Sequence, residues 1–203
     1  MTIKNICIHH SGGLGNNNRA STQSLTAHAI NQAHRDRWNY ISTLGYYGGY
    51  NFHIDQSGTI TQFRAIGEET MAQIGHNFDT VSICLSGNFS GVDTPTESQI
   101  ASLKYVMFSL LEKKHEFAVV PGTEISIGWG NIYPHRVLQP FHTECNGTSL
   151  PDDWGRKFMV EYLQHKLGIY KSILTVYIQL LSALRSLQSK NLGSNERECS
   201  GNI

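Results

Sequence analysis

Segments with the period of a β-strand alternate with segments with the period of an α-helix along this chain, and this order restricts its fold more than any single motif. Residues 80–86 alternate apolar and polar side chains, which places Val81, Ile83 and Leu85 on one face of a strand. Residues 97–114 instead repeat apolar side chains three or four positions apart, as a helix packed on a core does. Interleaved strands and helices of this kind predict an α/β domain.

Turn and capping signals predict the remaining elements. Ser21 and Thr22 are expected to cap a helix that ends near residue 38. Thr94–Glu97 is expected to form a capping box that opens a helix with Pro95 at its first position and its end near residue 114. The other expected elements are a strand at 3–8, a loop at 11–19, a loop at 43–50, a hairpin at 50–63, a strand at 115–121, a loop at 121–134 and a helix at about 152–167.

Length and composition exclude several classes of protein. The chain has 203 residues, of which 39% are hydrophobic, which is enough for one domain with a core. Sixteen Lys and Arg balance sixteen Asp and Glu, so the surplus of positive charge that a dedicated nucleic-acid binder needs is missing. The first residues lead directly into a strand pattern without the long apolar core of a signal peptide, and we expect no stable membrane span.

Histidine and cysteine offer the main chemical signal. The four cysteines form no C-x-x-C pair, which argues against a zinc ribbon or a thioredoxin-type redox site. His9 ends the first strand, His135 ends a loop-rich segment, and Cys145 follows ten residues later. Two imidazoles and a thiolate suit Zn²⁺ and leave a fourth position for water. The alternative is that His9 is a hydrogen-bonded polar residue and Cys145 a small buried hydrophobic residue.

Several short motifs occur in the order found in one enzyme family. They are Ile8-His9-His10-Ser11, Ala33-His34 before Trp38, Gly49-Tyr50-Asn51-Phe52, Ser57-Gly58-Thr59-Ile60 before Arg64, Gly75-His76-Asn77, Val81 to Phe89, Pro95 to Ile100, His135-Arg136, and Thr143-Glu144-Cys145-Asn146-Gly147. Over about residues 1–165 the chain resembles the amidase-2 family of zinc-dependent N-acetylmuramoyl-L-alanine amidases, which includes phage lysozyme-type amidases and animal peptidoglycan recognition proteins. So many ordered matches make the resemblance specific.

The resemblance implies a fold and a site. The family fold is an α/β domain with a mixed central β-sheet flanked by helices. By position, the zinc ligands are His9, His135 and Cys145, and the catalytic residues are Tyr50 and Thr143. The bond that the family cleaves in peptidoglycan joins N-acetylmuramic acid to L-alanine. Thr143 stands where the family has lysine or threonine, and it offers a hydroxyl in place of a charge.

Four other matched positions are expected to contact the substrate, namely His34, Arg64, His76 and Asn77. For the two histidines the alternative is a structural role in holding the sheet. Val137 departs from the family pattern, since an acidic residue normally follows His-Arg, so a carboxylate that supports a ligand is expected to be missing. The segment from His135 to Cys145 is two residues longer than usual, and His142 within it is a further candidate polar group or ligand.

The C-terminal part forms a separate region. We expect the catalytic domain over 1–168, an amphipathic helix over 169–190 and a disordered tail over 191–203. The helix has a wide apolar face, for which three explanations remain open: packing on its own domain, self-association through a heptad-like seam, or contact with a membrane surface. The few basic residues nearby argue against the third.

Taken together, the sequence predicts a zinc amidase that cleaves peptidoglycan, of the phage endolysin type. The alternative is a module that binds muropeptide without cutting it, but relatives of that kind typically lose the zinc cysteine, and Cys145 is present. Without a signal peptide, the enzyme is expected to be made in the cytoplasm and to act on the cell wall.

Overall fold

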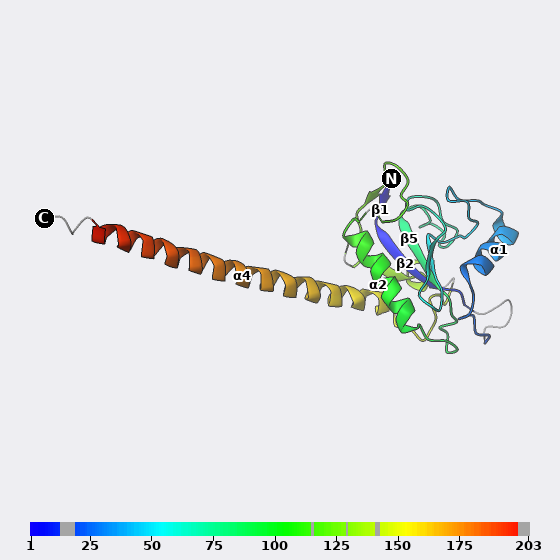
Figure 1. Cartoon of the computed structure of the whole chain (residues 1–203). Coiled ribbons are helices and arrows are strands. Elements are labelled where there is room, and N and C mark those ends of the chain that lie inside the picture. Colours follow the sequence, from blue (N-terminus) through cyan, green and yellow to red (C-terminus); the bar gives the residue numbers. More distant parts are fainter. Residues whose placement is uncertain (13–18, 115, 129, 141–142, 199–203) are drawn as a thin grey trace. The chain divides into compact units, whose positions relative to one another are not determined.

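The computed structural model describes residues 1–12, 19–114, 116–128, 130–140 and 143–198, with side chains as far as residue 187. The chain forms two compact units, Met1–Met159 and Val160–Ile203. The first unit contains the sheet and the predicted site, and the second continues the last helix of the chain (Figure 1).

A five-stranded mixed sheet forms the centre of the first unit, as predicted. Its strand order is β4-β3-β5-β2-β7, with β4 antiparallel to β3 and the other neighbours parallel. The strands are β2 Asn5–His10, β3 Phe52–Ile54, β4 Ile60–Gln62, β5 Thr80–Leu85 and β7 Ile132–Pro134. Two further short strands, β1 Thr2–Ile3 and β6 Glu124–Ile125, pair in parallel beside it.

The central strand β5 is buried on both faces. Its polar positions Ser82 and Cys84 are as inaccessible as Val81, Ile83 and Leu85. The alternating pattern therefore predicted the strand correctly, but it predicted one buried face where both are buried. Parallel strands lie on both sides of β5, and helices flank the sheet (Figure 1), so neither face of the strand reaches solvent.

Two helices flank the sheet, and both begin at other residues than the sequence indicated. Helix α1, Ala27–Trp38, is capped by Thr26 and not by Ser21 or Thr22, because the Thr22 hydroxyl bonds to the Gly12 carbonyl instead. Helix α2, Glu97–Leu111, has its capping box two residues later than predicted, between Thr96 and Gln99.

The segment between α2 and the last helix differs most from expectation. Within residues 116–121, the described part of the predicted strand, a single bridge joins Val119 to Ile66. The expected loop at 121–134 instead contains β6 and β7, and β7 leads into the short helix α3, His135–Leu138. Strands of two or three residues are too short to give a recognisable periodic pattern.

Helix α4, Trp154–Glu198, is continuous through Gly168, where a break was expected, and it includes residues 191–198 of the predicted tail. A glycine costs a long helix only about 1 kcal/mol relative to alanine. The first turns of α4 belong to the first unit, where Phe158 and Met159 are buried. Gly155 allows the close approach, because a Cβ there would lie 2.4 Å from Cδ1 of Ile8.

The part of α4 within Trp154–Leu187 is long and apolar enough to cross a membrane, judged by length and composition alone. No such segment was expected from the sequence.

Candidate metal centre

The register of the sheet brings His9 and His135 together. In the parallel pair β2–β7, Ile8 lies opposite Pro134, and the residue that follows each of them is a histidine. The two imidazole rings lie 4.6 Å apart, centre to centre. Residues 126 positions apart in the chain thus become neighbours through backbone pairing alone.

Cys145 reaches the same point from a loop. Its carbonyl accepts a hydrogen bond from the Arg136 amide, and its sulfur accepts one from the His10 amide at 3.4 Å. Sγ lies 3.6 Å from Nδ1 of His9. One potential ligand atom each from His9, His135 and Cys145 lies within 4.8 Å of the others, so the three predicted ligands converge.

Arg136, next to His135, holds the loop that carries Cys145. Its guanidinium donates to the carbonyls of Gly147 and Leu150 and to the side chains of Asn146 and Asp152. Because the same short helix carries His135 and Arg136, the positions of His135 and Cys145 are fixed together.

A buried glutamine determines which ring nitrogen of His9 carries the hydrogen. Nε2 of His9 lies 3.0 Å from Oε1 of Gln73, and the Gln73 amide group donates to the carbonyl of His76. A carbonyl can only accept, so the amide nitrogen must face it and Oε1 must face the imidazole. Nε2 therefore carries the hydrogen, and the lone pair is on Nδ1, the nitrogen that faces Cys145.

A second glutamine does the same for His135. Oε1 of Gln139 lies 2.6 Å from Nε2 of His135, and the Gln139 amide group donates to the carbonyl of Ile74. By the same reasoning, Nδ1 of His135 has the free lone pair. Two neutral amides, those of Gln73 and Gln139, thus take the supporting place that acidic groups often fill.

Burial keeps both imidazoles in the form that binds metals. It lowers the pKa of His9 well below the ordinary value, with a further contribution from His135, and it also lowers the pKa of His135. Burial raises the pKa of Cys145 to about 12, against the opposing effects of the His10 amide and Arg136. The sulfur therefore keeps its proton unless a cation displaces it.

The donor set fits zinc. Zn–N distances near 2.0 Å and Zn–S distances near 2.3 Å at a tetrahedral angle place the two donor atoms roughly 3.5 Å apart. The separation of Nδ1 of His9 and Sγ of Cys145, 3.6 Å, agrees with this. Two neutral imidazoles and a cysteine that binds as the thiolate are also the ligand types that zinc prefers.

Tyr50 lies beside this cluster, just before β3. Its ring lies 5.2 Å from that of His9 and 5.4 Å from that of His34. Burial, followed by the nearby Cys84 and Cys145 thiols, raises the pKa of Tyr50 well above the ordinary value, so the phenol stays protonated.

A family model described as N-acetylmuramoyl-L-alanine amidase matches residues 1–148. The chain belongs to this amidase family. Comparison with curated protein sequences finds no match.

Solved structures of similar fold include both enzymes and recognition proteins. N-acetylmuramoyl-L-alanine amidase LysC from Clostridium intestinale URNW is 24% identical, with 82% of this chain and 85% of that chain covered and a TM-score of 0.50. The Ph2119 endolysin from Thermus scotoductus MAT2119 bacteriophage Ph2119 is 16% identical, with 73% and 79% covered and a TM-score of 0.50. Human PGRP-IBETAC in complex with glycosamyl muramyl pentapeptide is 18% identical, with 73% and 79% covered and a TM-score of 0.50. At these identities the likeness establishes the fold alone.

Two of the matched family positions hold the loop that carries Tyr50. Nδ1 of His34 accepts from the Gly49 amide at 2.8 Å, and burial, helped by Arg37 and Arg64, lowers the pKa of His34 to about 4. The fully buried guanidinium of Arg64 donates to the carbonyls of Gly48, Tyr40 and Glu69. Arg64 thus acts inside the fold and presents no surface to a ligand.

Two other matched positions hold the loop that carries Gln73. The Asn77 side-chain oxygen accepts from the amides of Ala72 and Gln73 and from the Thr70 hydroxyl. The His76 carbonyl accepts from Gln73, while its imidazole, about one-third exposed, lies 3.3 Å from Asp79. A substrate contact for either residue stays a prediction.

Thr143 lies beside Cys145. Its hydroxyl oxygen accepts from the Cys145 amide at 3.0 Å, so the hydroxyl hydrogen is still available for donation. The other candidate in this loop, His142, lies outside the described residues.

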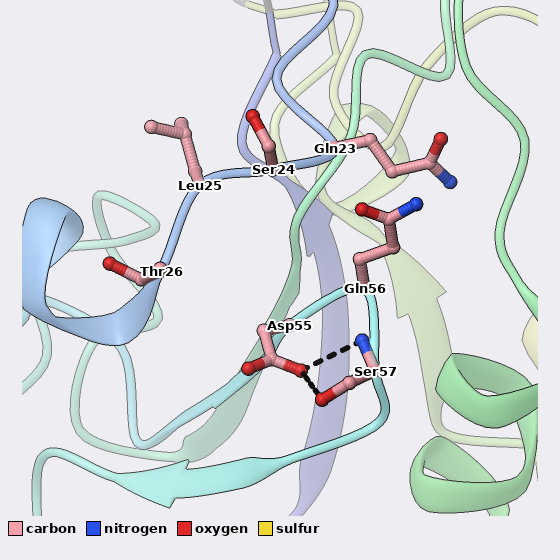
Figure 2. A pocket seen from close by; sticks show the side chains of 7 residues that line it. All are labelled: Gln23, Ser24, Leu25, Thr26, Asp55, Gln56 and Ser57. Carbon is pink, nitrogen blue, oxygen red and sulfur yellow. Dashed lines mark hydrogen bonds between the residues drawn. The ribbon is translucent and has the colours of Figure 1, made fainter.

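A separate hollow of about 370 Å³ lies between residues 23–26 and the hairpin turn at 55–57 (Figure 2). Asp55 accepts there from the amide and hydroxyl of Ser57. None of the predicted site residues lines this hollow, so it is distinct from the metal cluster.

Gln73 and Gln139 were not predicted from the sequence. The spacing of His135 and Gln139, one helical turn apart, could have indicated the second pair. No sequence signal connects Gln73 to His9, because 64 positions separate them.

Proposed function

We propose that the protein is a zinc-dependent amidase that hydrolyses the bond between N-acetylmuramic acid and L-alanine in peptidoglycan. The single observation that carries this proposal is the convergence of His9, His135 and Cys145, with the Nδ1 lone pair of each imidazole left free by its glutamine. Membership of the amidase family supplies the bond and the substrate.

Zinc held by these three residues would polarise the scissile carbonyl and lower the pKa of a water molecule. Gln73 and Gln139 keep the two imidazoles oriented, and burial keeps them neutral. The remaining polar groups of the site act on the substrate side.

Tyr50 and Thr143 are the two hydroxyl donors beside the cluster. The raised pKa of Tyr50 keeps its phenol protonated, which suits it to donate to the oxyanion of a tetrahedral intermediate. The Cys84 thiol contributes to this raised pKa. Thr143 contributes a neutral hydroxyl from the Cys145 loop.

The second candidate function is recognition of muropeptide without cleavage, since the structural neighbours include a peptidoglycan recognition protein with a bound muramyl pentapeptide. The Cys145 thiol favours the enzyme, because a binding groove needs no buried thiol between two imidazoles. We further propose that the enzyme is of the phage endolysin type, made in the cytoplasm and acting on the cell wall.

Peptidoglycan digestion tests the proposal. Purified protein should release stem peptides with newly freed L-alanine amino groups, a chelator should abolish the release, and added Zn²⁺ should restore it. Intact binding to peptidoglycan with no release under any metal condition would overturn the amidase in favour of the recognition module.

A cysteine substitution tests the ligand assignment. Cys145→Ser should lower zinc affinity more than about 100-fold, a larger loss than that expected for a supporting residue, and should abolish the release of peptides. Cys199→Ser, which removes a thiol from the last five residues, is the matched control and should bind one zinc per chain. A Cys145→Ser protein that still carries one zinc would contradict the assignment.

A further inference from the structure

The described part of the second unit, residues 160–198, belongs to helix α4, which carries a wide arc of apolar side chains. Described by itself, the segment has large apolar side chains that are each more than one-third exposed, and these are Ile169, Tyr170, Ile173, Leu174, Val176, Tyr177, Ile178, Leu180, Leu181, Leu184 and Leu187. At 100° per residue they cover about 200° of the helix surface, roughly twice the stripe of a helix packed on a core.

This arc is too wide for the seam of a two-helix coiled coil. A heptad seam would use Tyr170, Ile173, Tyr177, Leu180, Leu184 and Leu187. After such pairing Ile178 would stay in water, and the side chains that flank the seam would be covered only in part, namely Ile169, Leu174, Val176 and Leu181. An apolar medium around the helix would cover the seam residues and the other apolar residues alike.

The serine and threonine hydroxyls of the segment are already satisfied within the helix. Ser172, Thr175 and Ser182 each donate to the carbonyl four residues earlier, at 3.0, 2.9 and 3.0 Å. A polar group in a bilayer must find its partner inside the protein, and these three have done so without a second chain.

Length and charge agree with a bilayer. Residues 167–184 contain one charged residue, Lys171, and span about 27 Å at 1.5 Å per residue, close to the thickness of a hydrocarbon core. Lys171 lies about one turn from the end, within reach of the headgroups along its own stem. Between Glu161 and Glu196 the chain has no acidic residue, but it has Lys166, Lys171, Arg185 and Lys190.

We propose that residues 167–184 of α4 insert into a lipid bilayer with anionic headgroups. The wide apolar arc contacts the acyl chains, and the acid-free flanks place their cations against the headgroup charge. Basic residues are few near this segment, but insertion depends first on apolar length and on satisfied polar groups. The proposal is independent of amidase activity.

Vesicle flotation with the full chain tests this. Vesicles of phosphatidylcholine and phosphatidylglycerol should carry most of the protein to the top of a density gradient. Leu174→Lys, off the heptad seam, should lower the bound fraction at least about tenfold, because a second charge then lies inside the segment. Gln164→Lys adds the same charge outside the segment and is the matched control, expected to float like the parent protein.

A fluorescent variant measures depth. Tyr177→Trp places an indole near the middle of the segment, and lipids brominated deep in the acyl chain should quench it more strongly than lipids brominated near the headgroup. A parent protein that stays at the bottom of the gradient, or a stable dimer in water that ignores vesicles and tolerates Leu174→Lys, would overturn the proposal. Quenching from the headgroup region alone would overturn insertion.

Discussion

The candidate metal centre has a sheet side, with His9 and Gln73, and a loop side, with His135, Cys145 and Gln139. Both sides use the same hydrogen bond from histidine to glutamine, in different surroundings. On the sheet side, His9 and Gln73 are each 1% exposed, and His9 lies on a strand with neighbours on both edges. On the loop side, His135 and Cys145 are half-buried, and Gln139 follows a short helix. Each histidine donates from Nε2 to a glutamine whose amide is held by a backbone carbonyl.

The difference shows what burial adds to an identical hydrogen bond. Solvent can replace a partner on the loop side, whereas on the sheet side a lost partner leaves a buried donor unsatisfied. We therefore expect the sheet side to couple metal binding to folding and the loop side to affect metal binding alone.

The largest effect is expected from Gln73→Leu. This change leaves Nε2–H of His9 and the Ser82 hydroxyl without their shared acceptor, so zinc affinity should fall about 10–100-fold. The free energy of unfolding of the metal-free protein should fall by about 1–3 kcal/mol. Competition with a chelator and urea denaturation measure the two quantities. Gln73→Glu keeps an acceptor for His9 and should lose less affinity; equal losses in the two variants would contradict the role of Oε1.

A smaller effect is expected from Gln139→Leu. Zinc affinity should fall about tenfold, because His135 loses the partner that orients it. The free energy of unfolding should change by less than about 0.5 kcal/mol at this half-exposed position. The same two titrations apply, with Gln139→Glu as control. If this variant is destabilised as much as Gln73→Leu, the two sides do not differ as we infer.

The smallest expected effect is a change of stability with pH, and it concerns His53, two strands away from His9. Across the sheet, His9 pairs with Cys84 and Cys84 with His53, whose pKa burial lowers to about 4. The unfolded chain, with an ordinary histidine pKa near 6.5, takes up its proton first. Stability from this group is therefore nearly complete above about pH 7.5 and is lost as the pH falls toward 4, by about 0.7 kcal/mol between pH 7 and pH 6.

Denaturation at several pH values measures this slope. His53→Gln retains a donor for the Ser86 hydroxyl and should flatten the pH dependence between 6.5 and 4. An unchanged slope in this variant would assign the acid sensitivity to other groups.

The sequence predicted much of the fold and of the site, for reasons that particular residues illustrate. The apolar alternation of Val81, Ile83 and Leu85 and the helical repeat after Thr96 are local, so β5 and α2 were found. Three-residue β7 was missed because it is too short to show a period. It is this strand that sets His135 beside His9.

What the sequence determined by itself is the chemistry that is available: two histidines and a cysteine in family order, a tyrosine in G-Y-N-F, and a long apolar segment near the end of the chain. The tertiary structure decided which nitrogen of each imidazole is free, because that depends on Gln73 and Gln139 and on the backbone carbonyls that orient them. It also assigned Arg64 to the interior, where three carbonyls hold it. Hydrogen-bond partners at long sequence separation follow no periodic pattern, so only the folded chain specifies them.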